Sequence, residues 1–207
     1  MKIIALIAQK GGAGKTTLAL SLAVAAEQAG ETTVIYDLDP QATACNWGDR
    51  RSTDTPVIVD VQPARLQKAI ERAEKEEVDL IILDTPPRSE QASLAAAKAA
   101  DLIIIPCRPQ IYDLETLRNT QQLINYAGNQ SALVVLNAVP SRGTRHEQAK
   151  QAIQGMGLTV ASAQLGNRAA FGDAGALGLT ALEYEPTGKA AQEILHVYKS
   201  ICHTVGK

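Results

Sequence analysis

Short runs of consecutive apolar residues recur along the chain and alternate with amphipathic stretches. The apolar runs cover residues 2–8, 32–39, 78–85, 101–106 and 131–139. They are rich in β-branched residues and are bounded by Gly, Pro or Asp, which is typical of strands that are buried on both faces of a parallel sheet. Each run is therefore predicted to be a strand.

Helical patterns separate these runs, and they cover residues 15–29, 63–77, 90–100 and 113–127. The first is apolar on nearly all sides and ends at Gly30, a residue type that often follows a helix directly. The second carries its apolar residues on one face and its charges on the other. The alternation of strands and helices predicts an α/β fold with a doubly wound, mostly parallel sheet and helices on both faces.

The pattern is weaker after Val139. We expect a helix over 144–157, a last strand over 158–165, mostly loop over the Gly- and Ala-rich residues 167–186, and a closing amphipathic helix over 187–205. No linker, repeat or low-complexity segment interrupts the chain. A single domain spanning residues 1–207 is predicted.

Composition narrows the functional classes. Aromatic residues make up only 3% of the 207 residues, so the core must consist of Ala, Val, Ile and Leu, and the net charge of −2 requires any nucleic-acid contact to rest on a local patch. No apolar run reaches the roughly 18 residues of a membrane span. The first run is short and leads into a Gly-rich loop and not into a cleavage site, so a buried strand is the better interpretation than a signal peptide. Cys45, Cys107 and Cys202 are widely spaced, as expected for free thiols of a reducing cytosol.

The segment "KGGAGKTT" (10–17) joins a strand to a helix and has the composition of a phosphate-binding loop. The loop itself consists of Gly11, Gly12, Ala13 and Gly14. Its glycines allow backbone amides to curve around a phosphate at the positive end of the following helix. Lys15 is predicted to reach the β- and γ-phosphates, Thr16 to ligate Mg²⁺, and Thr17 to hold the α-phosphate. Gln9 stands where the strict motif has its first glycine, so the match is to a variant form.

Acidic residues follow two other predicted strands. Asp84 ends the apolar run of "LIILDTPP" (80–87) and is expected to bind Mg²⁺ through water. In "IYDLDPQ" (35–41), Asp37 and Asp39 alternate and so point to opposite sides of a strand. Asp39, next to Pro40, is the better candidate for positioning the attacking water near the metal and the γ-phosphate. Asp37 could support Mg²⁺ or the loop, and for both aspartates a simple turn signal is the alternative.

The three motifs "KGGAGKTT", "DLDPQ" and "ILDTPP" resemble the deviant Walker A, A′ and B motifs of the ParA family of partition ATPases, within the MinD/ParA group. The resemblance covers residues 1–140 well and the remainder loosely. It implies ATP and Mg²⁺ as ligands, with Lys10, Lys15 and Asp39 as catalytic residues. It also implies a homodimer that sandwiches two ATP molecules, in which Lys10 crosses to the partner's phosphates. A cation delivered in this way would neutralise charge on the transferred phosphoryl group, as an arginine finger does.

The resemblance assigns further positions more loosely. Asn137, at the end of its predicted strand, matches a residue that often bonds adenine in related proteins, and a turn role is the alternative. In "CRPQIYDLETL" (107–117), Asp113 and Glu115 match a segment that approaches the dimer interface.

Members of the ParA family bind DNA non-specifically as ATP dimers, and this chain shows no helix-turn-helix before its first strand. The resemblance therefore implies weak, salt-sensitive contacts made by basic residues towards the C-terminal side. The candidates are Arg142, Arg145, Arg168, Lys189 and Lys199. An ordinary charged surface is the alternative.

The expected function is thus an ATPase that positions or segregates DNA, in the cytoplasm and on the nucleoid, with a cognate partner protein that stimulates slow hydrolysis. A ParA-like ATPase that positions a non-DNA cargo shares every motif and stays open. A MinD-type membrane-cycling ATPase needs a basic amphipathic C-terminal helix. Residues 189–203 carry Glu193 between two lysines, so we expect no stable membrane association. An electron-transfer ATPase like the nitrogenase iron protein needs cluster-binding cysteines, and the context of Cys45 and Cys107 does not match.

Overall fold

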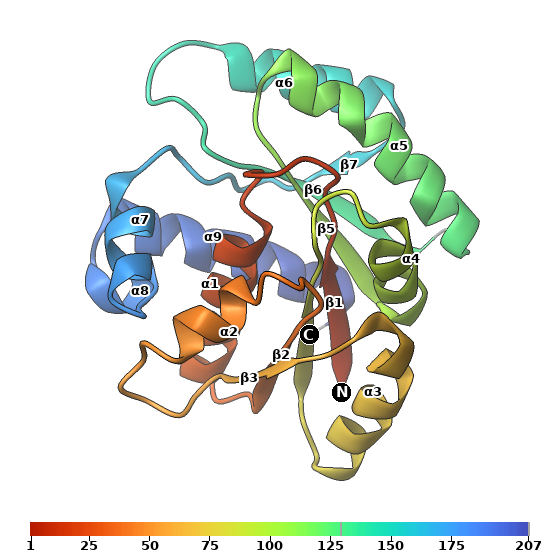
Figure 1. Cartoon of the computed structure of the whole chain (residues 1–207). Coiled ribbons are helices and arrows are strands. Elements are labelled where there is room, and N and C mark those ends of the chain that lie inside the picture. Colours follow the sequence, from red (N-terminus) through yellow and green to blue (C-terminus); the bar gives the residue numbers. More distant parts are fainter. Residues whose placement is uncertain (129, 207) are drawn as a thin grey trace.

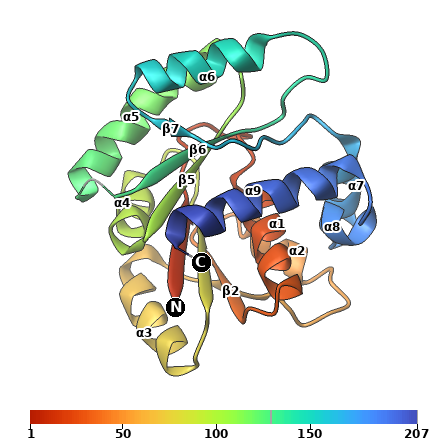
Figure 2. The same cartoon turned by 180° about the vertical axis from the view of Figure 1, so that it is seen from behind.

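The computed structural model describes residues 1–128 and 130–206, and over these residues the chain forms one parallel sheet of seven strands covered by helices on both faces (Figures 1 and 2). The strands are β1 (Lys2–Leu6), β2 (Thr33–Asp37), β3 (Val57–Asp60), β4 (Leu80–Asp84), β5 (Leu102–Cys107), β6 (Ala132–Leu136) and β7 (Thr159–Val160). Their order in the sheet is β3-β2-β4-β1-β5-β6-β7, and each strand pairing is parallel.

The helices form two layers (Figures 1 and 2). One layer contains α1 (Lys15–Gln28), α2 (Thr43–Gly48), α7 (Ala169–Ala176), α8 (Ala181–Tyr184) and α9 (Lys189–Val205). The other contains α3 (Leu66–Lys75), which follows the 3-10 turn η1 (Pro63–Arg65), together with α4 (Glu90–Ala99), α5 (Ile111–Ala127) and α6 (Arg145–Gly155).

Two apolar clusters fill the space between the sheet and these layers. Alternate strand residues point to opposite faces, so Ile4 and Leu6 of β1 pack toward α1, whereas Ile3 and Ala5 pack toward the other layer. Helix α1 lies between the sheet and α9, which explains why its sequence is apolar on nearly all sides. Burial on both faces therefore explains the continuous apolar runs from which the strands were predicted.

The predicted fold class is confirmed, but some elements differ. The interpretation of 167–186 as mostly loop was wrong, because α7 and α8 lie there, and the last strand shrinks from 158–165 to Thr159–Val160. Helix α8 has a signal that could have revealed it, since Thr180 and Glu183 form a capping box. Strand β3 and helix α2 were missed. β3 is a four-residue edge strand with mostly exposed side chains, so it lacks the apolar run that marks the others.

The sheet order brings the acidic motifs to one edge. In the register, Asp84 at the end of β4 pairs with Leu6 of β1 on one side and with Asp37 of β2 on the other. The hydroxyl of Thr85 donates a hydrogen bond of 2.7 Å to the Leu6 carbonyl oxygen and ties the two strand ends together. The chain leaves β1 toward β2 on one side, while β5 lies on the other side of β1, which makes this edge a switch point where ligands of α/β sheets bind.

Candidate nucleotide-binding site

The glycine-rich loop connects β1 to α1 and has the backbone that its sequence requires. Gly12 and Gly14 have φ values of 72° and 97°, which residues with a side chain rarely adopt. A Cβ atom on Gly14 would also lie 2.0 Å from Nδ2 of Asn137. Gly14 precedes the first turn of α1, where no side chain caps the helix and no acidic residue occurs. The first amides of α1 are thus left to an external anion.

Lys15 opens α1 and is buried, with 7% of its surface exposed. Its ammonium group makes no hydrogen bond or ion pair with any residue that the structure describes. Burial lowers the pKa of Lys15, while the nearby carboxylates of Asp84 and Asp39 act in the opposite direction. Most of the Lys15 side chain is withdrawn from water and its ammonium group has no protein partner in the described part of the chain, so a phosphate held by the loop would supply one.

Asp84 is the complementary feature on the sheet. It is 1% exposed, and within the described part of the chain neither carboxylate oxygen has a hydrogen-bond partner of good geometry. Burial raises its pKa to about 7, against a smaller lowering effect of the nearby Thr16 hydroxyl and Lys15. Carboxylate and hydroxyl oxygens are the ligands that Mg²⁺ takes, often through water. The unpaired Asp84 beside Thr16 therefore fits a hydrated Mg²⁺.

The structure distinguishes Asp37 from Asp39. Asp37 is completely buried, and its carboxylate accepts hydrogen bonds from the backbone amides of Asp39, Ala44 and Cys45 at 3.1, 2.9 and 3.2 Å. Burial raises the pKa of Asp37, and these amides partly offset the effect. Of the alternatives for Asp37, these contacts match support of the loop. Asp39 is only partly buried, its Oδ1 accepting a hydrogen bond from the Gln41 amide at 3.0 Å.

Asn137 follows β6 and reaches the glycine-rich loop. Its Nδ2 donates to the Ala13 carbonyl oxygen at 2.7 Å, and its Oδ1 accepts from the Ala138 amide at 2.8 Å. Both functions of the side-chain amide are thus used within the chain. Contact with adenine stays a prediction, and the contact that the sequence did not reveal is the one with the loop.

Residues with a strained backbone lie in the loops that follow Asp39, Asp84 and Asn137. Ala42, Arg88 and Ala138 are three of the four non-glycine residues with positive φ in the described part of the chain, at 50°, 58° and 49°. They follow Asp39, Asp84 and Asn137 respectively, each within four residues. Such conformations cost about 1–3 kcal/mol each and persist where the surroundings enforce them, often at ligand sites.

Lys10 does not point into open solvent. Its Nζ lies 2.6 Å from Oδ2 of Asp113 in the first turn of α5, and 5.7 Å from the centre of the Tyr112 ring. Arg108, which follows β5, binds the same carboxylate. The sequence singled out Lys10 and Asp113 but not Arg108, and nothing in the spacing connects residues about a hundred positions apart.

The predicted DNA-contacting residues lie in different settings. Arg142, Arg145, Lys189 and Lys199 are exposed. Arg168 instead pairs with Glu193 of α9, which keeps the pKa of Arg168 above its ordinary value. Arg168 is consequently a weaker candidate for a phosphate contact than the four exposed residues.

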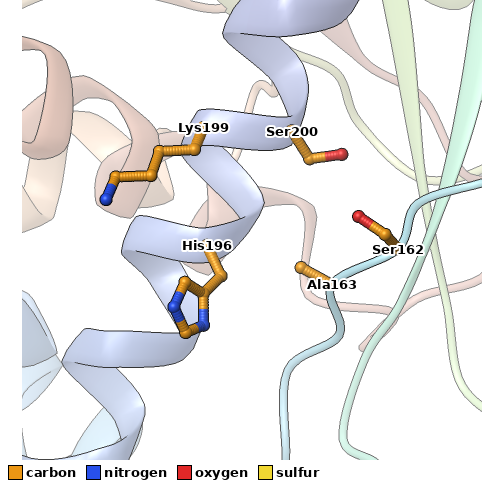
Figure 3. A pocket seen from close by; sticks show the side chains of 5 residues that line it. All are labelled: Ser162, Ala163, His196, Lys199 and Ser200. Atoms are coloured by element: carbon orange, nitrogen blue, oxygen red, sulfur yellow. The ribbon is translucent and has the colours of Figure 1, made fainter.

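Lys199 belongs to a shallow hollow between α9 and the segment after β7, with a volume of about 400 Å³ (Figure 3). The hydroxyl groups of Ser162 and Ser200 face each other across it, whereas the Lys199 side chain extends the other way (Figure 3). None of the residues that line this hollow belongs to the nucleotide site. Lys199 thus lines the rim of this hollow while its exposed side chain stays available to the solvent.

A sequence profile described as the CobQ/CobB/MinD/ParA nucleotide binding domain matches residues 4–181. The chain belongs to this family. The match includes the nucleotide site from Lys10 to Asn137, whereas Lys189 and Lys199 lie beyond it. Membership establishes a nucleotide-binding domain of the ParA/MinD type, in agreement with the buried Lys15 and Asp84.

Relatives in the ParA/MinD family include the "Maintenance of carboxysome distribution protein A" of Gloeobacter kilaueensis, 29% identical over 210 aligned residues that cover 100% of this chain and 94% of that protein. The "Sporulation initiation inhibitor protein Soj" of Bacillus subtilis is 30% identical over 60% of this chain and 64% of its own length. Among solved structures, the septum site-determining protein MinD of Pyrococcus horikoshii with Mg-ADP superimposes with a TM-score of 0.81, at 20% identity over 99% of this chain and 97% of that one. This last likeness shows the fold.

In the described part of this ParA/MinD-family chain, every helix is too short or too polar to cross a lipid bilayer.

Proposed function

We propose that this protein is an ATPase that dimerises when it binds ATP, hydrolyses ATP to ADP and phosphate, and uses this cycle to position a cargo. The observation that carries the proposal is the buried carboxylate of Asp84, whose oxygens have no hydrogen-bond partner among the described residues. It lies at the same sheet edge as Lys15, which is largely buried and makes no ion pair in the described part of the chain. A buried carboxylate left without a hydrogen-bond partner is costly for the free protein. The magnesium salt of a nucleoside triphosphate supplies both missing partners.

Each residue of the nucleotide site has a defined role in this proposal. The loop amides of Gly11, Gly12, Ala13 and Gly14, with Lys15, bind the β- and γ-phosphates, and Thr17 binds the α-phosphate. Thr16 and Asp84 hold Mg²⁺, with Asp39 nearby. Bound Mg²⁺ neutralises charge on the phosphate oxygens. Asp39, half-buried after β2, orients the attacking water, while Asp37 keeps the loop that carries Asp39 in place.

Two subunits complete each other's sites in this proposal. Lys10 of each subunit reaches the γ-phosphate held by the other, because Lys15 already serves the nucleotide of its own chain. Hydrolysis on its own is slow in this proposal, since the sequence offers no obvious strong general base for the attacking water. A cognate partner protein on the cargo stimulates it, and the ADP form separates.

The ATP dimer binds DNA non-specifically in the cytoplasm and uses the nucleoid as its support, as expected for plasmid or chromosome partition. A non-DNA cargo is the second candidate. One observation favours it: the carboxysome distribution relative matches along the whole chain, whereas the match to Soj covers 60% of it. The ATPase cycle is the same in both cases.

The test measures molecular mass by light scattering with ADP and with ATP, together with phosphate release. We expect a monomer with ADP and a dimer with ATP, and the Asp39→Ala variant should accumulate the ATP dimer because its water is no longer oriented. Lys10→Ala should bind ATP and stay monomeric. Lys98→Ala, which removes an exposed lysine of α4, is the matched control and should behave like the parent. Equal dimerisation of Lys10→Ala and the parent would exclude the role of Lys10 across the interface.

A further inference from the structure

We propose that Arg88 of each subunit forms an ion pair with Glu115 of the partner subunit in the ATP dimer, so that the two chains exchange two such pairs. This inference rests on the proposed function, because it concerns the dimer that forms with ATP. It assigns a role to Arg88, which none of the three sequence motifs includes.

An open hollow with a volume of about 460 Å³ lies beside the glycine-rich loop. Its walls come from three segments: Gln9 and Lys10 at the start of the loop, Arg88 after β4, and a face of α5 that includes Tyr112 and Glu115. Helix α4, which follows Arg88, lies next to α5 (Figure 1). In the proposed dimer Lys10 reaches into the other subunit, so the partner must lie over this hollow.

The hollow contains two opposite charges that do not meet within the chain. Arg88 and Glu115 are both exposed, and neither makes an ion pair with any residue that the structure describes. Lys10, the other cation of the hollow, is already paired with Asp113. Arg88 and Glu115 are therefore both available to charges that another molecule brings.

The backbone presents Arg88 from a turn that is fixed on both sides. Arg88 has a φ of 58°, which residues with a side chain rarely adopt and which often occurs where function requires that side chain. On one side of the turn, the Thr85 hydroxyl bonds the Leu6 carbonyl oxygen at 2.7 Å. On the other side, Ser89 caps α4 by accepting a hydrogen bond from the Ala92 amide at 3.3 Å. The base of the Arg88 side chain is thus held in place at the wall of the hollow.

A second copy of the chain matches both charges at once. In a twofold interface, a contact from Arg88 to Glu115 of the partner subunit is always accompanied by the reverse contact from Glu115 to the partner's Arg88. The same pairing covers Ile111 and Tyr112, which are 61% and 69% exposed at the start of α5. Apolar and aromatic side chains inside a polar rim are the usual composition of a protein interface.

Charge reversal distinguishes a contact between subunits from one within a subunit. Arg88→Glu places two carboxylates opposite each other at both contacts, and Glu115→Arg places two guanidinium groups there. Each variant alone should therefore dimerise weakly. In a mixture of the two variants, the introduced glutamate faces the introduced arginine at one contact, and the native Arg88 and Glu115 meet at the other. The mixed dimer should consequently be tight.

The experiment measures the dimer dissociation constant with ATP and Mg²⁺ by sedimentation, in the Asp39→Ala background to suppress hydrolysis. We expect each reversal alone to raise it about tenfold, as for the loss of two surface ion pairs, and the mixture to regain the parental value. Lys75→Glu and Glu74→Arg are the matched controls. They make the same changes of charge at exposed residues of α3, which leads into β4 at the opposite end of that strand from Arg88, and should leave the constant unchanged.

Two further measurements identify what has formed. Native mass spectrometry, with one of the two variants isotopically labelled, should show mixed dimers in large excess over uniform ones. Calorimetry with ADP should show that both variants still bind nucleotide, because neither side chain belongs to the phosphate site.

The outcomes separate the two proposals. Absence of an ATP dimer in the parent overturns the proposed function. A parent that dimerises, with reversals that dimerise equally well, overturns the ion pair. Reversals that bind ADP but stay monomeric when mixed also overturn it, because Arg88 would then serve another ligand. If a reversal fails to bind ADP, Arg88→Gln and Glu115→Gln decide instead: each should raise the dissociation constant about threefold, and an unchanged value contradicts the proposal.

Discussion

Asp37 and Asp84 are neighbours in the sheet register and almost equally buried, yet their environments are opposite. Asp37 accepts three backbone hydrogen bonds, whereas both oxygens of Asp84 lack a partner of good geometry among the described residues. A buried polar group without a partner costs about 1–3 kcal/mol, and more when it is charged. The free protein therefore carries a local instability at Asp84 that a bound cation would remove.

Replacing each aspartate by asparagine tests this difference. Asp84→Asn should raise the free energy of unfolding of the nucleotide-free protein by about 1–3 kcal/mol, because it removes a buried charge without a partner. The same substitution should weaken binding of Mg-ATP, because the metal loses that charge. Asp37→Asn should lower the free energy of unfolding by a similar amount, since it loses an acceptor for the backbone amides. Urea unfolding and calorimetry of nucleotide binding measure both effects. Destabilisation by Asp84→Asn would show that its carboxylate is satisfied in the free protein.

The sequence predicted the residues of the site better than it predicted their contacts. Lys15, Thr16 and Asp84 follow from spacing, because a short loop and a strand end leave them little freedom. The contacts of Asn137 and Lys10 are different, since their partners Ala13 and Asp113 lie more than a hundred residues away. Only the order of strands in the sheet brings such residues together, and a single sequence does not state that order.

At the scale of elements, α2 is joined to the hairpin of α7 and α8. Trp47 donates from its indole nitrogen to the Leu179 carbonyl oxygen at 3.0 Å, and Arg51 binds both the Gly178 carbonyl oxygen and the Glu183 carboxylate. The prediction of a loop over 167–186 failed for this reason. The small residues of this segment give little helical signal, and contacts with α2, more than a hundred positions earlier, stabilise it.

The ion pair between Arg51 and Glu183 should contribute measurably to stability. The two side chains are 5% and 22% exposed, so Glu183→Gln should lower the free energy of unfolding by about 1–2 kcal/mol at pH 7. Glu76→Gln is the control, because its pair with Arg72 is exposed and such pairs contribute little. An equal loss in both variants would show that burial of the pair is unimportant.

The same pair gives a pH dependence with a defined sign. Burial alone would raise the pKa of Glu183, but Arg51 and the Thr180 amide lower it below its ordinary value of 4.5. A lowered pKa in the folded state means that the stabilisation is present above pH 4.5 and is lost as the pH falls through the folded-state value. The deficit of Glu183→Gln, measured by urea unfolding, should therefore shrink in acid.

At the scale of the whole molecule, the acidic balance limits how the protein can bind DNA. A chain with a net charge of −2 gains little from a duplex as a whole. Binding must come from a few exposed cations, and pairing two copies in the ATP dimer would double their number and strengthen the attachment. Affinity for DNA should accordingly depend on ATP and fall steeply with salt.

Substitutions at two arginines allow this to be tested with two variants of the same net charge. Arg142 is exposed and makes no ion pair among the described residues, whereas Arg168 is paired with Glu193. Burial alone would raise the pKa of Glu193, but its contacts with Arg168 help to lower that pKa. Arg142→Gln should weaken binding of the ATP dimer to random-sequence DNA and reduce the slope of log affinity against log salt by about 1 for each phosphate that is no longer neutralised. Arg168→Gln should change both quantities less, because the charge of Arg168 is already matched by Glu193.

Both substitutions remove one positive charge, so any difference between them in a titration with labelled DNA reports local binding and not net charge. Equal effects would mean that DNA either takes Arg168 from Glu193 or senses only the total charge, and weakening confined to Arg168→Gln would place the DNA-binding surface beside α7 and α9.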